Sequence, residues 1–182
     1  MKGYQRQFPL FSLCGLNCGL CTMYMGGHCP GCGGEGHRPC ALLRCSAQHG
    51  ALEYCFQCSQ YPCERYDHFM EYDSFITHQN IQKDVALARR IGLTSYQSQL
   101  KEKMAILSTL LEHYNDGRRK TLFSTALILL ELEEIRQVMA RLTEQTKAAP
   151  SVKERAAAAA ALLEAAAKKQ GAELKLKKKP KS

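Results

Sequence analysis

The sequence predicts a mainly α protein, in which a small, loop-rich, cysteine-rich module stapled by metal precedes an all-α helical bundle. Three observations support this fold class. All ten cysteines lie between Cys14 and Cys63. Beyond residue 76, apolar residues recur every three or four positions, which is the periodicity of amphipathic helices. An alanine-rich stretch with high helix propensity follows Pro150. We therefore expect a cysteine-rich metal-binding module at 1–70, a bundle of about three helices at 71–148, and an alanine-rich helix with a basic disordered tail at 149–182.

The cysteines are spaced as metal ligands are. Three C-x-x-C pairs begin at Cys18, Cys29 and Cys55, and this spacing lets two thiolates reach one ion from a tight turn. Four further cysteines within the same 50 residues make the signal strong. We predict that all ten are candidate metal ligands: Cys14, Cys18, Cys21, Cys29, Cys32, Cys40, Cys45, Cys55, Cys58 and Cys63.

The thiolates do not decide which metal they hold. Four ligands from each half of the set would form two tetrahedral Zn²⁺ sites and leave a spare pair, and such sites supply folding free energy to loop-rich segments. All-cysteine ligation also suits [4Fe–4S] clusters. His28 and His37 are alternative fourth ligands, and disulfides between the closely spaced cysteines are a further alternative.

The spacing of Cys14, Cys18 and Cys21 is that of the cluster loop in radical S-adenosylmethionine enzymes. Those enzymes close a large α/β barrel, and this sequence contains no series of strands alternating with helices. We find no set of Ser, His and Asp or of paired carboxylates within one motif either. The sequence therefore favours a metal-binding module that serves an unknown protein partner over an enzyme, with a redox or thiol-chemistry iron–sulfur protein as the alternative.

Helix start and stop signals divide the rest of the chain. Gly92 should end one helix, and Asn115-Asp116-Gly117 should form a turn between two longer ones. Ser151 and Glu154 form a capping box before the alanine-rich helix, whose small side chains offer little apolar surface for docking. The expected helices span a turn near 22–25, then 40–50, 63–70, 77–91, a segment capped by Thr94 or Ser95, 120–146 and 151–169.

The net charge of +8 is concentrated at the end of the chain. Residues 151–182 carry nine Lys or Arg against three Glu, which is +6. The lysine-rich segment from Gly171 should be a flexible cationic arm that binds polyanions weakly and without reading their sequence, because no aromatic residue is available for base stacking. A second basic group at a helix start is a candidate anion-binding site: Arg118, Arg119 and Lys120.

Two predictions concern location. No apolar run is long enough to cross a membrane, and the first residues lack the apolar region of a signal peptide, so we expect a cytoplasmic protein with no membrane association. In a reducing compartment, cysteines at this density are expected to bind metal rather than form structural disulfides.

The cysteine-rich segment resembles the prokaryotic Cys-rich family of unknown function catalogued as domain of unknown function 3795. The resemblance implies a bacterial or archaeal cytoplasmic protein, and family members are frequent in anaerobes, but it supplies no activity. All ten cysteines fall on cysteine positions of the family pattern, and the tail after Pro150 has no counterpart there. The matching runs are CGLNCGLC at 14–21, CPGC at 29–32, LRC at 43–45 and EYCFQCSQYPCE at 53–64. Two later runs, at 71–78 and 114–120, resemble the helical extension of a longer subgroup of this family.

Overall fold

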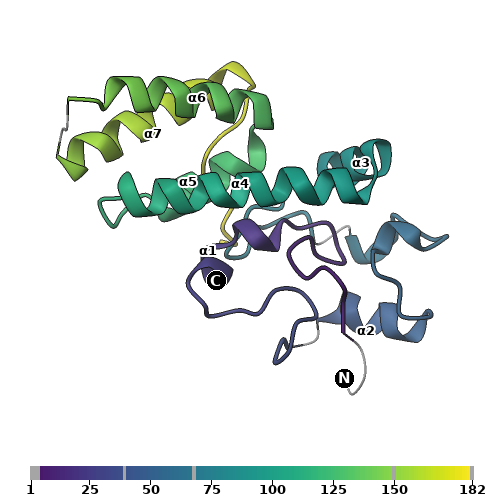
Figure 1. Ribbon diagram of the computed structural model, residues 1–182. Helices are drawn as coiled ribbons and strands as arrows, with labels where there is room; N and C mark the ends of the chain where they lie inside the picture. The colour runs from purple at the N-terminus through teal and green to yellow at the C-terminus, as the bar shows by residue number, and fades with distance from the viewer. Residues whose placement is uncertain (1–4, 39, 67–68, 149–150, 181–182) are drawn as a thin grey trace.

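The computed structural model describes residues 5–38, 40–66, 69–148 and 151–180, and the regular elements within them are helical, which confirms the prediction of a mainly α protein. Figure 1 shows α6 and α7 paired on one side of α4 and α5, with the irregular N-terminal coil on the opposite side. The α-helices are α1 (Thr22–Met25), α2 (Ala41–Gln48), α3 (Ile81–Ile91), α4 (Leu93–His113), α5 (Lys120–Leu129), α6 (Leu132–Gln145) and α7 (Val152–Lys169).

One hydrophobic core joins the cysteine-rich coil to the helices. Phe11 and Tyr54 come from the coil and are almost completely buried, and the Phe11 ring packs against both the Tyr54 ring and the Tyr96 ring of α4. Leu20 is also buried in this core, and its carbonyl accepts a 2.6 Å hydrogen bond from the Ser124 hydroxyl on α5. The cysteine-rich region therefore rests on the helical bundle through shared apolar packing, in addition to any contribution from metal.

Several local signals have the predicted outcome. The helical turn α1 and the short helix α2 form where the sequence places them. Gly92 adopts a φ of 85° between α3 and α4, a value that favours glycine, and so ends α3 as expected. The Asn115 carboxamide accepts a hydrogen bond from the Gly117 N–H and forms the predicted turn. Ser151 and Glu154 form both hydrogen bonds of the capping box.

Three predicted boundaries differ from the structure. The helix expected from residue 77 begins at Ile81, and α4 begins at Leu93 rather than after Thr94 or Ser95. The helix expected over 63–70 is a 3-10 turn at Glu64–Tyr66, and residues 67 and 68 lie outside the described part of the chain. Among the described residues of this segment, helical propensity around Cys63 is therefore realised as one short turn.

The single helix predicted over 120–146 is wrong, because the chain breaks between α5 and α6. Leu130 is extended, with a φ of −86° and a ψ of 146°, and only 1% of its surface is exposed. The Lys103 ammonium donates a 2.8 Å hydrogen bond to the Leu130 carbonyl, which therefore has a partner outside the helix. The break lets α6 change direction and pack against α7.

The expectation that the alanine-rich helix would not dock is also wrong. Helix α7 packs against α6 and α5. Alanine side chains let helix backbones approach closely, and two leucines supply the larger apolar contacts on the same face. The buried residues are Ala156, Ala159, Ala160, Leu162, Leu163, Ala166 and Ala167.

The segment after α7 runs back along the molecule in extended form. Asp73 and Lys177 exchange two hydrogen bonds of 2.8 Å, one to the Lys177 carbonyl and one from its N–H. The Gln79 side chain donates to the Lys175 carbonyl, and Leu174 packs partly against the core. These contacts differ from the disorder that the lysine-rich composition suggests, although the lysine side chains themselves are exposed. No helix in the described residues is long and apolar enough to span a membrane.

Candidate metal centre

The first thiol group consists of Cys14, Cys18 and Cys21, which precede α1, and of Cys29 and Cys32, which follow it. Burial raises the pKa of Cys18 well above its ordinary value, and the charges of the other four cysteines raise it further. Because the interaction between charges weakens with distance, these effects indicate that Cys18 lies in the neighbourhood of the other four thiols. Their backbone is held by local hydrogen bonds, such as that from the Cys21 N–H to the Cys18 carbonyl.

The second thiol group consists of Cys45, Cys55, Cys58 and Cys63, which line one small cavity of about 40 Å³. Cys45 is presented by α2, and the other three come from the irregular chain that follows. His49, at the end of α2, lines the same cavity. Its Nδ1 lies 2.8 Å from the Cys45 carbonyl oxygen and 3.6 Å from the Cys45 sulfur. A space of this size suits a single ion or water molecule.

Cys55 lies at the boundary between the two thiol groups. Burial raises its pKa to about 11, the Tyr66 hydroxyl opposes this, and Cys63, Cys45 and Cys32 raise it further. Tyr66 is itself buried beside these thiols and donates a 3.2 Å hydrogen bond to the Cys14 carbonyl. The two groups are thus neighbouring parts of one cysteine-rich region and share a polar partner.

Arg6 and Glu53 form an ion pair beside the first thiol group. The Arg6 guanidinium is completely buried, lies 3.0 Å from the Glu53 carboxylate, and donates to the Glu53 and Cys32 carbonyls. Its positive charge opposes the rise in the pKa of Cys32 that burial causes. A buried cation beside a thiol favours the thiolate, which is the form that binds metal.

Nine of the ten free thiols belong to these two groups, but they do not converge on a common point. Within the described residues, no three Cys, His, Asp or Glu side chains are placed so as to hold a metal ion. Burial raises the pKa of Cys14 to about 12, so the Cys14 sulfur is a protonated thiol in this arrangement. By residue type the donor set nevertheless suits a thiophilic metal, because four residues with soft sulfur donors line one small cavity.

Three further candidate ligands lie away from the sulfurs just described. Cys40 is exposed and does not line the cavity of the second thiol group, although its charge raises the pKa of Cys32. His28 is exposed. The Nδ1 atom of His37 is buried without a hydrogen-bond partner among the described residues, and burial lowers the pKa of this imidazole. A neutral imidazole with an unused nitrogen retains the capacity to act as a ligand.

Four residues around the thiols are not predicted from the sequence as parts of a site: Ser12, Arg6, His49 and Tyr66. The Ser12 hydroxyl lies 3.1 Å from the Cys14 sulfur and also accepts a hydrogen bond from the Leu16 N–H. His49 interacts with the Cys45 carbonyl of α2, as its position in the sequence suggests. It lines the cavity only because residues 55–63 lie beside the end of α2. A search for polar residues within a few positions of each cysteine would have found Ser12 and His49, but not Arg6.

The basic group at the start of α5 has internal partners. The Asn115 and Asp116 side chains accept hydrogen bonds from the Arg119 and Arg118 N–H groups, respectively. The Asp116 carboxylate also lies 3.8 Å from the Arg119 guanidinium. These carboxamide and carboxylate groups occupy donors that an anion would use, while Arg118 and Lys120 remain exposed. Anion binding at Arg118, Arg119 and Lys120 stays a prediction.

Comparisons with protein-family models, with curated proteins and with solved structures found no match to this chain. The resemblance of the cysteine-rich segment to a prokaryotic family therefore stays a prediction.

Proposed function

We propose that the chain is a metal-binding protein whose cysteine-rich region holds Zn²⁺ and whose helices form a scaffold for a protein partner. The observation that best supports this proposal is the cavity of about 40 Å³ that is lined by Cys45, Cys55, Cys58 and Cys63. Four thiolates at about 2.3 Å from the ion form a closed tetrahedral site, which leaves no open position for a substrate. Such a site stabilises a fold and is not expected to catalyse a reaction.

A structural role agrees with how the surrounding chain is built. Among its described residues, the segment from 26 to 66 has one short α-helix and two 3-10 turns, so most of it lies outside regular secondary structure. Its apolar contribution is a small cluster that includes Leu42, Leu43 and Tyr66. Metal binding supplies on the order of 10 kcal/mol of folding free energy to segments of this kind. We therefore assign the second thiol group to Zn²⁺ as a staple.

An iron–sulfur cluster with a redox or thiol-chemistry role is the second candidate function, and the first thiol group favours it. Cys14, Cys18 and Cys21 have the spacing of a cluster loop, and two more thiols lie beside them. The five sulfurs exceed what one tetrahedral Zn²⁺ site needs. The two metals differ in colour and stoichiometry, so one preparation discriminates between the two functions.

The test is anaerobic purification of the full chain, followed by elemental analysis and an absorption spectrum. We expect about two zinc ions per chain and a colourless protein. Four or more irons with inorganic sulfide, and absorbance above 350 nm that dithionite bleaches, would instead establish the iron–sulfur alternative. A chain that folds fully with neither metal refutes both proposals.

Serine variants assign the site. Cys58→Ser should lose about one zinc ion per chain, because it removes a ligand from a closed four-sulfur site. Cys40→Ser is the matched control, since Cys40 is exposed and does not line the cavity. Equal zinc loss in the two variants would contradict the assignment of the four ligands.

A further inference from the structure

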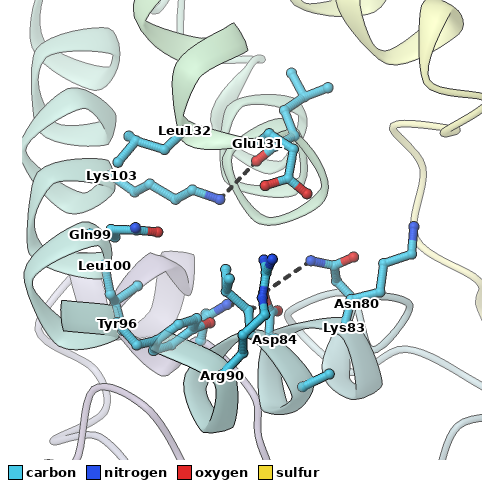
Figure 2. Close-up of a pocket in the computed structure, with 14 residues that line it drawn as sticks. Asn80, Lys83, Asp84, Arg90, Tyr96, Gln99, Leu100, Lys103, Glu131 and Leu132 are labelled. Atoms are coloured by element: carbon cyan, nitrogen blue, oxygen red, sulfur yellow. Dashed lines mark hydrogen bonds between the residues drawn. The ribbon is translucent and has the colours of Figure 1, made fainter. Parts of the chain in front are cut away.

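Another cavity, of about 350 Å³, is lined by residues of α3 and α4, by the junction of α5 and α6, and by the loop between Cys14 and Cys18. Its size is within the range of pockets that bind small molecules. Asn17, which stands in that loop, forms part of its floor, so the loop that carries Cys14 and Cys18 also contributes to this cavity, whose lining contains no cysteine. Figure 2 shows the side chains that surround it.

The floor of the cavity is a buried and fully paired polar network. Asp84, Asn17 and Tyr96 are each at most 5% exposed. The Asn17 amide donates to one Asp84 oxygen at 2.9 Å, and the Asn80 amide donates to the other at 3.0 Å. The Tyr96 hydroxyl donates to the side-chain oxygen Oδ1 of Asn17 at 2.9 Å. A satisfied network of this kind is rigid and gives the cavity a fixed polar surface.

Positive charge faces this floor from two helices. Lys103 of α4 reaches across the cavity, and its ammonium donates to the Leu130 carbonyl, which leaves two of its three N–H donors for another partner. Arg90 extends from α3 into the space below Lys103 in Figure 2. Lys83 lies two helical turns from Arg90 and lines the same cavity. Within the described part of the chain, neither Lys83 nor Arg90 makes a side-chain hydrogen bond or ion pair.

The lining therefore has unused cationic donors beside an apolar wall. The lining includes three cations and two carboxylates, Asp84 and Glu131, and both Asp84 oxygens already accept hydrogen bonds. The apolar wall gives a ligand a dry surface for a hydrocarbon or aromatic body, and it consists of Ala86, Leu87, Leu100, Leu130 and Leu132. Donors that have no protein partner complement an acceptor with negative charge.

We propose that this cavity binds a small organic anion, in which a carboxylate or phosphate group contacts Lys103 and Arg90 and a short apolar body lies against the leucine wall. The proposal goes beyond metal binding and does not depend on it. Carboxylate and phosphate ligands share the chemistry that the two cations recognise, so the two sources are compared in the experiment.

The experiment is a titration of the full, isotopically labelled chain, observed by amide chemical shifts, with benzoate, phenyl phosphate and benzamide as probes. Benzamide is the neutral counterpart of benzoate. We expect saturable shifts at cavity residues with at least one anionic probe, and binding at least about tenfold weaker for benzamide, because a charge-assisted hydrogen bond is lost. The anion that binds more tightly identifies the preferred group.

Two neighbouring arginines supply a matched pair of variants. Both arginines are exposed, but only Arg90 lines the cavity. Arg90→Gln should therefore weaken binding of the anionic probe by several-fold or more, whereas Arg89→Gln removes the same charge beside the cavity and should leave binding unchanged. Lys103→Met should weaken binding by about tenfold. Because Lys103 also holds the Leu130 carbonyl, the Arg90→Gln and Arg89→Gln pair decides the matter if Lys103→Met does not fold.

Three results would overturn the proposal. The first is the absence of saturable shifts at the cavity with either anion. The second is equal affinity for benzamide and benzoate, which would make the pocket apolar in its recognition. The third is an equal effect of Arg89→Gln and Arg90→Gln, which would reduce the interaction to general surface charge.

Discussion

Replacing Asp84 by Asn should change how the stability of the protein depends on pH. Burial raises the pKa of Asp84 from 3.8 to about 7, while Lys103, Tyr96 and Asn80 oppose the rise. The native state therefore keeps a proton at pH values where the unfolded chain has released it. Between pH 4 and pH 7 the native state binds more protons than the unfolded state, so the free energy of unfolding falls as the pH rises.

The magnitude follows from the difference between the two pKa values. At about 1.36 kcal/mol per pKa unit, the wild-type chain loses about 3 kcal/mol of stability through Asp84 between pH 4 and pH 7, and about 4 kcal/mol in total once the pH is well above 7. Asp84 is only 5% exposed, so solvent does not screen this effect. The Asn variant does not titrate, but its amide can replace only one of the two accepting oxygens, which costs about 1 kcal/mol. At pH 8 the variant should therefore be more stable than the wild type by about 3 kcal/mol.

The assay is urea unfolding followed by circular dichroism at several pH values from 4 to 8. Glu164→Gln is the control, because Glu164 is an exposed carboxylate on α7 and its replacement should leave the wild-type profile unchanged. Effects of metal on stability are common to the three proteins and cancel in the differences. The wild-type and Asp84→Asn profiles should cross near the acid end of the range. Parallel profiles would refute the reasoning, since they would mean that Asp84 is ionised in the native state at every pH tested.

Three further predictions concern the packing of α7, the tail and the start of α5. Leu163→Ala should lower the free energy of unfolding by about 2–5 kcal/mol because Leu163 is completely buried, and urea unfolding with Glu164→Ala as the exposed control checks this. A loss below about 0.5 kcal/mol would mean that α7 does not dock. Deleting residues 171–182 should abolish retention on nucleic acid at low salt while leaving the helical circular dichroism signal intact; retention that survives the deletion places the polyanion site on the helical body. Arg118→Ala together with Arg119→Ala should weaken binding of inorganic phosphate at the start of α5, measured by calorimetry, and unchanged phosphate affinity would end that prediction.

The sequence by itself determined the helical class and most of the turns. Positions that depend on one or two neighbouring residues were predicted correctly, including the end of α3 at Gly92 and the capping box of Ser151 and Glu154. Such signals are local, because they use the φ of one glycine or a hydrogen bond across three residues. The concentration of cysteines in one region was equally visible, since it needs only residue identities and spacing.

Tertiary structure decided what lies between distant segments. The sequence near the break at Leu130 contains no proline or glycine that would predict it. The break is stabilised by a hydrogen bond from Lys103, on another helix, to the Leu130 carbonyl. The docking of α7 was missed because a stripe of alanines shows its value only when another helix approaches closely. The same holds for the arrangement of the thiols, whose pairing depends on the return of the chain from Cys45 to Cys63.

The anion cavity illustrates the same limit most clearly. Asn17, Asp84 and Tyr96 come from three segments, and no local pattern connects a residue of a cysteine loop with a carboxylate 67 positions later. An isolated Asp on an amphipathic helix predicts a solvated surface charge, whereas this one is buried because the cysteine loop and α4 close over it. Hydrophobic periodicity fixes which face of a helix is buried. Which polar groups meet on that face is decided only when the helices pack together.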